Sequence, residues 1–189
     1  LPILAEKVDV KIEKPWAPVA IPVDSVSVEI SRGWHRAYIA TGSNMGDKKA
    51  YLDEAVEKLK NHPYCKVVKV SDYITTEPYG GVEQDVFLNG ALEIKTLLYP
   101  EELLALLNRI EAEAGRERTI HWGPRTLDLD ILFYDDCIID SPELTVPHID
   151  MQNRGFVLIP MAQIAPYHRH PVLGCTVGQL LSRLDGSLS

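Results

Sequence analysis

The sequence predicts an α+β domain in which two helices cover one face of an antiparallel sheet. Apolar residues alternate with polar ones in four strand-length segments, and two further segments show the 3.6-residue spacing of amphipathic helices. Their order along the chain is β-α-β-β-α-β, which is the ferredoxin-like sandwich. We also expect an N-terminal β-hairpin and additional C-terminal elements.

The first half of this succession opens with a strand at 36–40 and a turn at 41–44. The helix that follows places its apolar residues at helical spacing, namely Leu52, Ala55, Val56 and Leu59. His62-Pro63 ends the helix because proline cannot continue it. A single strand is predicted next, at 67–75.

The second half repeats the pattern after a loop. Its elements are a strand at 85–96, a helix from Pro100 to a stop at Gly115, and a strand at 126–134. Short helices near 154–161 and 177–184 extend the domain.

The N-terminal segment has the pattern of a β-hairpin. Apolar and charged residues alternate over 7–14, and they alternate again over 26–30 after a proline-rich turn. An isolated hairpin is marginally stable, so we expect this one to pack on the main domain or to mediate self-association. We place the hairpin at 1–32, a joint at 33–35 and the main domain at 36–189.

Composition narrows the class of protein. Of the 189 residues, 46% are hydrophobic and 24% are charged, and the formal net charge is −8 at pH 7, which disfavours nucleic acid as a partner. No apolar run approaches the ~20 residues of a membrane span. Three widely spaced cysteines favour the reducing cytoplasm. Residue 1 is Leu rather than Met, which suggests that the chain begins inside a longer gene product.

Two carboxylates lie two residues apart in the last predicted strand. Asp128 and Asp130 therefore face the same side of the sheet, where their charges repel unless a cation separates them. Mg²⁺ suits such a pair because it takes one or two carboxylates together with substrate phosphates. The preceding loop supplies Arg116, Arg118 and Arg125, whose guanidinium groups suit phosphate oxygens. A solvated face with ordinary salt bridges is the alternative.

Phe87 and Asn89 occupy alternate positions of the strand at 85–96 and therefore share a face. A flat heterocycle could stack on Phe87 while Asn89 offers its edge a donor and an acceptor. Alternatively, Phe87 covers a loop and Asn89 caps a turn.

Six segments carry a family resemblance. The most specific is the run Trp122-Gly123-Pro124-Arg125-Thr126-Leu127-Asp128-Leu129-Asp130; the others are 38–44, 76–80, 87–89, 146–148 and 153–156. With them, residues 36–184 resemble the 6-hydroxymethyl-7,8-dihydropterin pyrophosphokinases of folate biosynthesis. The chain departs from the family pattern at Thr119 and His121, in the loop that supplies the three arginines, and at Ile149.

The resemblance implies that a pyrophosphoryl group passes from ATP to the pterin hydroxymethyl group and that AMP is released. Two Mg²⁺ ions are then held by Asp128 and Asp130. The positions that match the pterin site are Thr76, Pro78, Tyr79, Phe87, Asn89, Trp122 and Phe156. The positions that match ATP and phosphate contacts are Asn108, Glu111, Arg116, Arg118, Arg125, His148 and Arg154.

Residues 1–32 resemble a different enzyme family, through the segments 10–15 and 26–32. They are similar to the C-terminal strand pair of dihydroneopterin aldolase, and Lys14 matches that family's catalytic lysine. The resemblance implies an aldolase tail fused to a complete pyrophosphokinase domain. An unrelated strand extension is the alternative.

Three rival functions fit parts of the pattern. RNA-recognition modules share the element order, but the acidic charge and the Asp pair would repel RNA. A metal-dependent phosphohydrolase would use the same Asp pair and release free phosphate. A zinc site at His168, His170 and Cys175 is a third reading, although Pro171 favours an exposed loop there.

Overall fold

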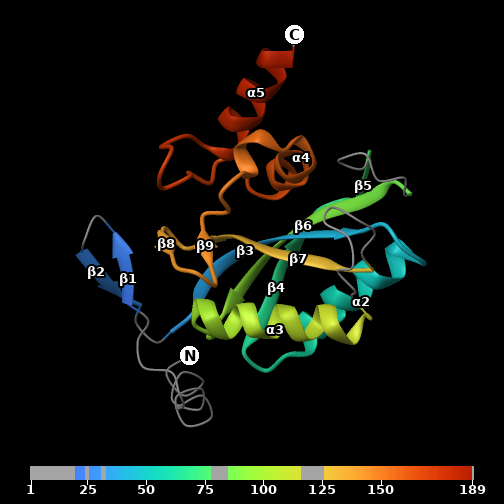
Figure 1. Ribbon diagram of the computed structural model, residues 1–189, viewed down its shortest axis with the longest axis horizontal. Helices are drawn as coiled ribbons and strands as arrows, with labels where there is room; N and C mark the ends of the chain where they lie inside the picture. Colours follow the sequence, from blue (N-terminus) through green and yellow to red (C-terminus); the bar gives the residue numbers. More distant parts are fainter. Residues whose placement is uncertain (1–19, 24–25, 31–32, 78–84, 116–125, 189) are drawn as a thin grey trace.

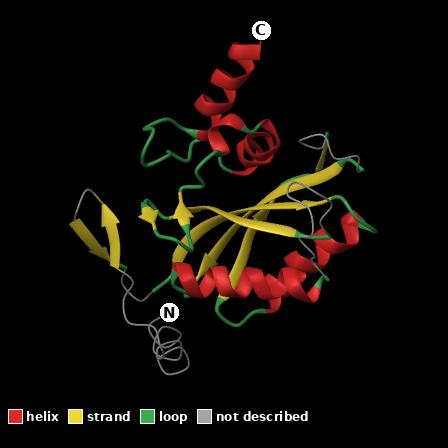
Figure 2. Cartoon of the chain, in the orientation of Figure 1, coloured by secondary structure: helices red, strands yellow, loops and turns green. Residues whose placement is uncertain are grey.

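The computed structural model describes residues 20–23, 26–30, 33–77, 85–115 and 126–188. Figures 1 and 2 show a central sheet with two helices below it and a smaller helical group above it. The elements that build the sheet and its lower layer are β3 (His35–Ser43), α2 (Lys48–Asn61), β4 (Cys65–Val70), β5 (Ile74–Thr76), β6 (Phe87–Thr96), α3 (Pro100–Glu113) and β7 (Asp128–Tyr134). The predicted α+β, ferredoxin-like class is confirmed.

The strand order explains why both long helices lie on the same side. The strands are arranged β4-β6-β3-β7, every neighbouring pair is antiparallel, and β5 pairs with the other end of β6. Each helix therefore connects two strands that a third strand separates, and both connections cross the lower face (Figure 1).

The lower face holds the larger part of the core. Fully buried residues from the strands, among them Ile39, Leu92 and Ile94, pack against the apolar stripes of α2 and α3. The α3 helix begins at Pro100, and the Glu102 side chain accepts a hydrogen bond from the Tyr99 N–H at 2.7 Å. This capping fixes the helix start, since it satisfies a backbone donor that the helix leaves unpaired.

The upper face is divided between packing and open surface. Its covered half packs against α4 (Gly155–Ile164) and α5 (Val177–Leu188), with Tyr38 and Phe133 buried beneath them. The remaining half of this face is not covered by either helix (Figure 1). Between β7 and α4 the chain forms the short pair β8 (Ile139–Asp140) and β9 (Thr145–Val146) and the 3₁₀ turn η1 (Met151–Asn153).

Two predicted strand boundaries are wrong. The turn expected at 41–44 begins later, because β3 continues to Ser43. The single strand expected at 67–75 is two strands, β4 and β5. The cause lies at Ser71, whose Oγ accepts the Ala91 N–H at 2.8 Å in place of a backbone carbonyl, so that the regular ladder is interrupted.

The N-terminal hairpin also differs from the prediction. Within the described residues, β2 (Val26–Glu29) pairs with β1 (Ala20–Val23), which was expected to belong to the proline-rich turn; the segment 7–14 lies outside the described residues. Only two residues separate these strands, a connection length that hairpins favour. β1 lies against β8, and Ile30 is 4% exposed within the core of the lower face. The chain is therefore anchored to the domain where it leaves the hairpin.

Candidate active site

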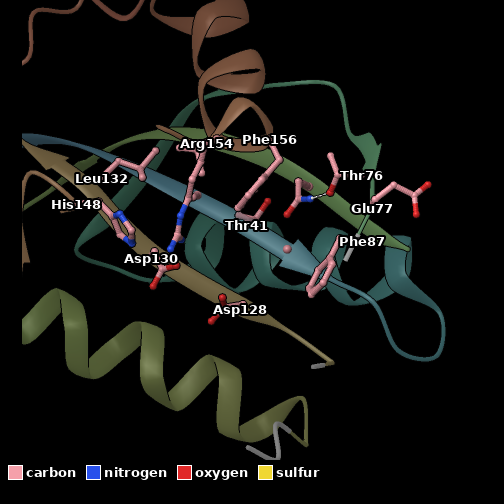
Figure 3. A pocket seen from close by; sticks show the side chains of 14 residues that line it. Thr41, Thr76, Glu77, Phe87, Asp128, Asp130, Leu132, His148, Arg154 and Phe156 are labelled. Carbon is pink, nitrogen blue, oxygen red and sulfur yellow. Dashed lines mark hydrogen bonds between the residues drawn. The ribbon is translucent and has the colours of Figure 1, made fainter. Parts of the chain in front are cut away.

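A pocket opens on the uncovered half of the upper sheet face (Figure 3). The described residues that line it come from β3, β5, β6, β7 and the segment that leads into α4. They are Ala40, Thr41, Gly42, Thr76, Glu77, Phe87, Asn89, Asp128, Asp130, Leu132, His148, Arg154, Phe156 and Val157. Residues far apart in the sequence thus meet on one surface.

One end of the pocket is charged, and we call Asp128, Asp130, His148 and Arg154 the carboxylate end. The two aspartates project from the same face of β7, as their spacing predicts, while Leu129 between them is buried in the core. The His148 backbone N–H donates to the Leu132 carbonyl at 3.0 Å, which ties the histidine to the same strand.

The basic groups of the carboxylate end are held by nearby contacts. Arg154 Nε donates to Asp150 Oδ2 at 3.1 Å, and Asn153 donates to the other oxygen of Asp150 at 2.8 Å. Burial lowers the pKa of His148, and the neighbouring Arg154 charge lowers it further. The imidazole is therefore neutral near pH 7; its Nδ1 accepts the Asp150 backbone N–H at 3.4 Å, so its Nε2–H can act as a donor.

Glu111 lies behind the aspartates on α3 and is 2% exposed. Its Oε2 accepts the Leu129 backbone N–H at 2.8 Å. Burial raises the pKa of Glu111 to about 8, and the charges of Asp128 and Asp130 contribute in the same direction, against the opposing effect of the Leu129 N–H. The raised pKa of Glu111 therefore reflects its burial first and the two neighbouring aspartates second.

The opposite end of the pocket suits a flat ring, and we call Thr76, Phe87, Asn89 and Phe156 the aromatic end. Asn89 Nδ2 donates to Thr76 Oγ1 at 2.6 Å, the contact drawn as a dashed line in Figure 3. The two Phe side chains reach the pocket from different layers, since Phe87 belongs to β6 and Phe156 to the first turn of α4. Two rings and a fixed carboxamide are thus available at one site.

The carboxylate end has the donor chemistry of a magnesium site. Within the described part of the chain, no group of three or more His, Cys, Asp or Glu residues is arranged to hold a metal. Two carboxylates without a third protein ligand fit Mg²⁺, which fills its remaining positions with water and phosphate oxygens.

The alternative zinc site is not supported. His170 Nδ1 accepts the N–H groups of Val172 and Leu173 at 3.2 and 3.1 Å, so this nitrogen is engaged in a backbone turn. His170 and Cys175 are buried rather than exposed as the sequence suggested.

The structure brings most of the predicted site residues together, with clear exceptions. Pro78, Tyr79, Arg116, Arg118, Trp122 and Arg125 lie outside the described residues, as do Thr119 and His121. Asn108 is exposed on α3 and does not line the pocket, and Glu111 lies behind it. The sequence interpretation missed the floor of the pocket, formed by Ala40, Thr41, Gly42 and Leu132. The small residues of β3 were the available signal.

Comparison with known proteins agrees with this geometry. Residues 38–166 match the model of the family described as 7,8-dihydro-6-hydroxymethylpterin-pyrophosphokinase. The chain belongs to this pyrophosphokinase family. The prediction made from the G-P-R-T-L-D-L-D run is therefore confirmed.

Individual relatives support the same assignment. The chain is 52% identical over 128 residues to the 2-amino-4-hydroxy-6-hydroxymethyldihydropteridine pyrophosphokinase of Bacillus subtilis, covering 68% of this chain and 77% of that protein. It is 47% identical over 127 residues to the bifunctional protein FolKE of Lactococcus lactis, covering 67% of this chain. The chain spans 36% of the length of that bifunctional relative.

A solved structure shares the fold at much lower identity. The crystal structure of wild-type Plasmodium falciparum HPPK-DHPS superposes with a TM-score of 0.66 at 15% identity, covering 84% of this chain and 46% of that one. Within the described residues, no helix has the length and apolar character needed to cross a membrane.

Proposed function

We propose that this chain transfers the pyrophosphoryl group of ATP to the hydroxymethyl group of 6-hydroxymethyl-7,8-dihydropterin, giving the pterin diphosphate and AMP. The observation that carries the proposal is the two-ended pocket, in which a carboxylate pair and an aromatic, amide-bearing surface share one open sheet face. A phosphorylated nucleotide and a flat heterocycle can then bind side by side.

The carboxylate end is assigned to ATP. Asp128 and Asp130 would hold Mg²⁺, and we expect two ions there; bound Mg²⁺ neutralises phosphate charge. Arg154 is oriented by Asp150 through Nε, which leaves its terminal amino groups free of that contact and available to phosphate oxygens. Neutral His148 can hydrogen-bond a phosphate or a ribose hydroxyl.

Arginines of the 116–125 segment complete the proposed phosphate site. Arg116, Arg118 and Arg125 lie outside the described residues, and their roles rest on the sequence motif alone. The same holds for Pro78, Tyr79 and Trp122 at the pterin. Asn108 and Glu111 are proposed near the nucleotide, with Glu111 acting by holding the strand that carries the aspartates.

The aromatic end is assigned to the pterin. Phe87 and Phe156 supply apolar ring surface, and Asn89 supplies an amide to the ring edge. A pterin bound at the aromatic end would direct its hydroxymethyl group toward the aspartates, where its oxygen can attack the β-phosphorus in line with the leaving AMP oxygen. The protein's main contribution is then positioning and charge stabilisation rather than proton abstraction by a strong base.

Product analysis tests this assignment. The chain is incubated with ATP, Mg²⁺ and the hydroxymethyl-dihydropterin, and nucleotides and pterins are separated by chromatography. Equal amounts of AMP and pterin diphosphate are expected. Free phosphate with ADP, or no pterin-dependent product, would contradict the proposal and favour the phosphohydrolase alternative.

We also propose that the N-terminal hairpin is the tail of an aldolase domain that contributes assembly rather than aldolase chemistry here. Lys14 lies outside the described residues, and a lysine whose pKa is not lowered stays protonated at neutral pH, which makes it a poor base. Three free cysteines are consistent with a reducing cytoplasm as the working compartment.

Deleting residues 1–29, which retains the buried Ile30, tests the role of the hairpin. The truncated protein is expected to keep pyrophosphoryl transfer while its self-association, measured by light scattering, changes. Cleavage of dihydroneopterin by the full 189-residue chain that is lost in Lys14→Ala would refute the proposal.

A further inference from the structure

Gly42 lies in the pocket floor between the two ends. It is in register with Asn89 of β6 on one side and with Asp128 of β7 on the other. Neighbouring strands are ~4.8 Å apart, so the Asn89 and Asp128 backbones are about 10 Å apart with Gly42 between them. The only strand position between the two functional ends therefore has no side chain.

The space above Gly42 is occupied by the side chain of Asn89. A Cβ placed on Gly42 would lie 2.7 Å from Oδ1 of Asn89, a separation that nonbonded carbon and oxygen atoms do not tolerate. On its other side, Nδ2 of Asn89 donates to Thr76 Oγ1 at 2.6 Å. The carboxamide thus extends from Thr76 of β5 to the bare backbone of β3, held by a hydrogen bond at one end and by close packing at the other.

We propose that Gly42 is the positioning residue that fixes the Asn89 carboxamide. The fixed carboxamide makes the aromatic end selective for a ring edge that carries a hydrogen-bond donor beside an acceptor. The proposal rests on the function proposed above. A side chain at position 42 displaces Oδ1, and the amide then no longer presents its remaining N–H and its oxygen in a fixed order. Pterin binding is therefore weakened. Nucleotide binding is not, because the three atoms nearest to a Cβ on Gly42 belong to Asn89 and Leu88 and not to the carboxylate end.

Gly90 provides a matched control one position along β6. A Cβ there would lie 2.8 Å from the ring of Tyr73 and 3.1 Å from Thr41 Oγ1. Tyr73 is packed against the core of the lower face, and its hydroxyl donates to Asp53 of α2 at 2.8 Å. Gly90→Ala therefore adds the same methyl group with a similar steric conflict, but away from the carboxamide.

The test is a double-variant cycle on pterin binding. Calorimetry measures the Kd of 6-hydroxymethyl-7,8-dihydropterin, with Mg²⁺ and a non-hydrolysable ATP analogue present, for Gly42→Ala, Asn89→Ala and the double variant. Gly42→Ala is expected to weaken pterin binding about tenfold or more and to leave analogue binding within about twofold. The double variant is expected to bind no more weakly than Asn89→Ala alone, because the added methyl then meets no carboxamide. Gly90→Ala should lower the Tm and change the pterin Kd much less than Gly42→Ala does.

Other outcomes overturn the inference. Pterin binding by Gly42→Ala within about twofold of wild type, or strictly additive losses in the double variant, would contradict it. If Gly42→Ala does not fold, the Tm of the double variant decides: a value equal to that of Asn89→Ala supports the inference, and a much lower value contradicts it. A wild-type chain that binds the pterin but forms no AMP contradicts the proposed function without affecting this result. A wild-type chain that does not bind the pterin contradicts both.

Discussion

The two faces of the central sheet are built by the same strands but serve different purposes. In β7, Leu129 and Ile131 point down into the core between the sheet and α3, while Asp128 and Asp130 point up into the pocket. Helices α2 and α3 cover the lower face, whereas the helices α4 and α5 cover only half of the upper face (Figure 1). Along the part of the upper face that carries the pocket, parity therefore decides whether a strand residue lies in the core or in the site.

This division teaches that stability and chemistry can be altered separately. The lower face gains stability by burying apolar surface, whereas the upper face keeps like charges close together, an arrangement that opposes folding. Substitutions on the lower face should therefore reduce stability more than activity, and substitutions in the pocket should reduce activity more than stability.

The largest effect is expected at the carboxylate end. Asp130→Asn should reduce pyrophosphoryl transfer by about a thousandfold, because it removes half of the charge available to Mg²⁺. Its Tm should be equal to or higher than that of the wild type, since one source of repulsion beside Glu111 is removed. Steady-state AMP formation measures the rate, and a thermal melt measures the Tm. Unchanged activity of the variant at limiting Mg²⁺ would contradict the assignment of Asp130 as a Mg²⁺ ligand.

The next effect is expected on the lower face. Leu107 is fully buried in α3, so Leu107→Ala should lower the free energy of unfolding by about 3 kcal/mol. The folded protein should bind the pterin as the wild type does. Urea unfolding measures the stability, and Leu104→Ala, at a partly buried position of the same helix, is the control that should lose less. A selective loss of pterin affinity in Leu107→Ala would show that the faces are not separable.

A smaller effect is expected at the aromatic end. Phe87→Ala should weaken pterin binding by about 1–2 kcal/mol through the lost ring stacking, with ATP-analogue binding unchanged. Phe87 is only partly buried, so the Tm should change little. Calorimetry with each ligand checks this, and a loss confined to the ATP analogue would reverse the assignment of the two ends.

The smallest effect concerns Asp135, which follows β7. Burial would raise the pKa of Asp135, but the hydrogen bonds from His35 at 2.5 Å and from the Arg36 N–H at 2.9 Å hold it below its usual value. Ionised Asp135 therefore stabilises the fold above the unfolded-state pKa of about 3.9, and this contribution is lost as the pH falls through the lower folded-state pKa.

Asp135→Asn should accordingly cost about 1 kcal/mol at pH 7. The backbone at this position has φ of 47°, which asparagine adopts readily, so the change adds no backbone strain; it removes the charge together with one of the two acceptor oxygens. Urea unfolding at a series of pH values should show the difference between wild type and variant shrinking toward pH 3. A difference that is constant with pH would mean that the carboxylate charge is not responsible.

Local patterns in the sequence predicted much of the fold and of the site. Alternation in β7 placed Asp128 and Asp130 on one face because side-chain direction in a strand depends only on parity. The spacing of apolar residues and the positions of proline also located α2 and α3, because both signals depend only on residues close together in the sequence.

Features that depend on distant partners were not predictable in this way. The break between β4 and β5 arises because Ser71 bonds to Ala91, twenty residues away. The role of Gly42 depends on its register with Asn89 and Asp128, which the sequence does not display. Alternation in the N-terminal segment did not distinguish 7–14 from 20–23 as the partner of β2, because a single hairpin has no core to select one register.

The central claim, that the open half of the upper face has a nucleotide end and a pterin end, is tested most directly by crossed binding measurements. The Kd of the pterin and the Kd of the Mg²⁺-bound ATP analogue are each measured alone for Asn89→Ala and Asp128→Asn. We predict that Asn89→Ala loses about tenfold for the pterin and Asp128→Asn loses about tenfold or more for the Mg²⁺-bound analogue, with each variant unchanged toward the other ligand. Equal losses of both ligands in both variants, or the reversed pattern, would contradict the claim.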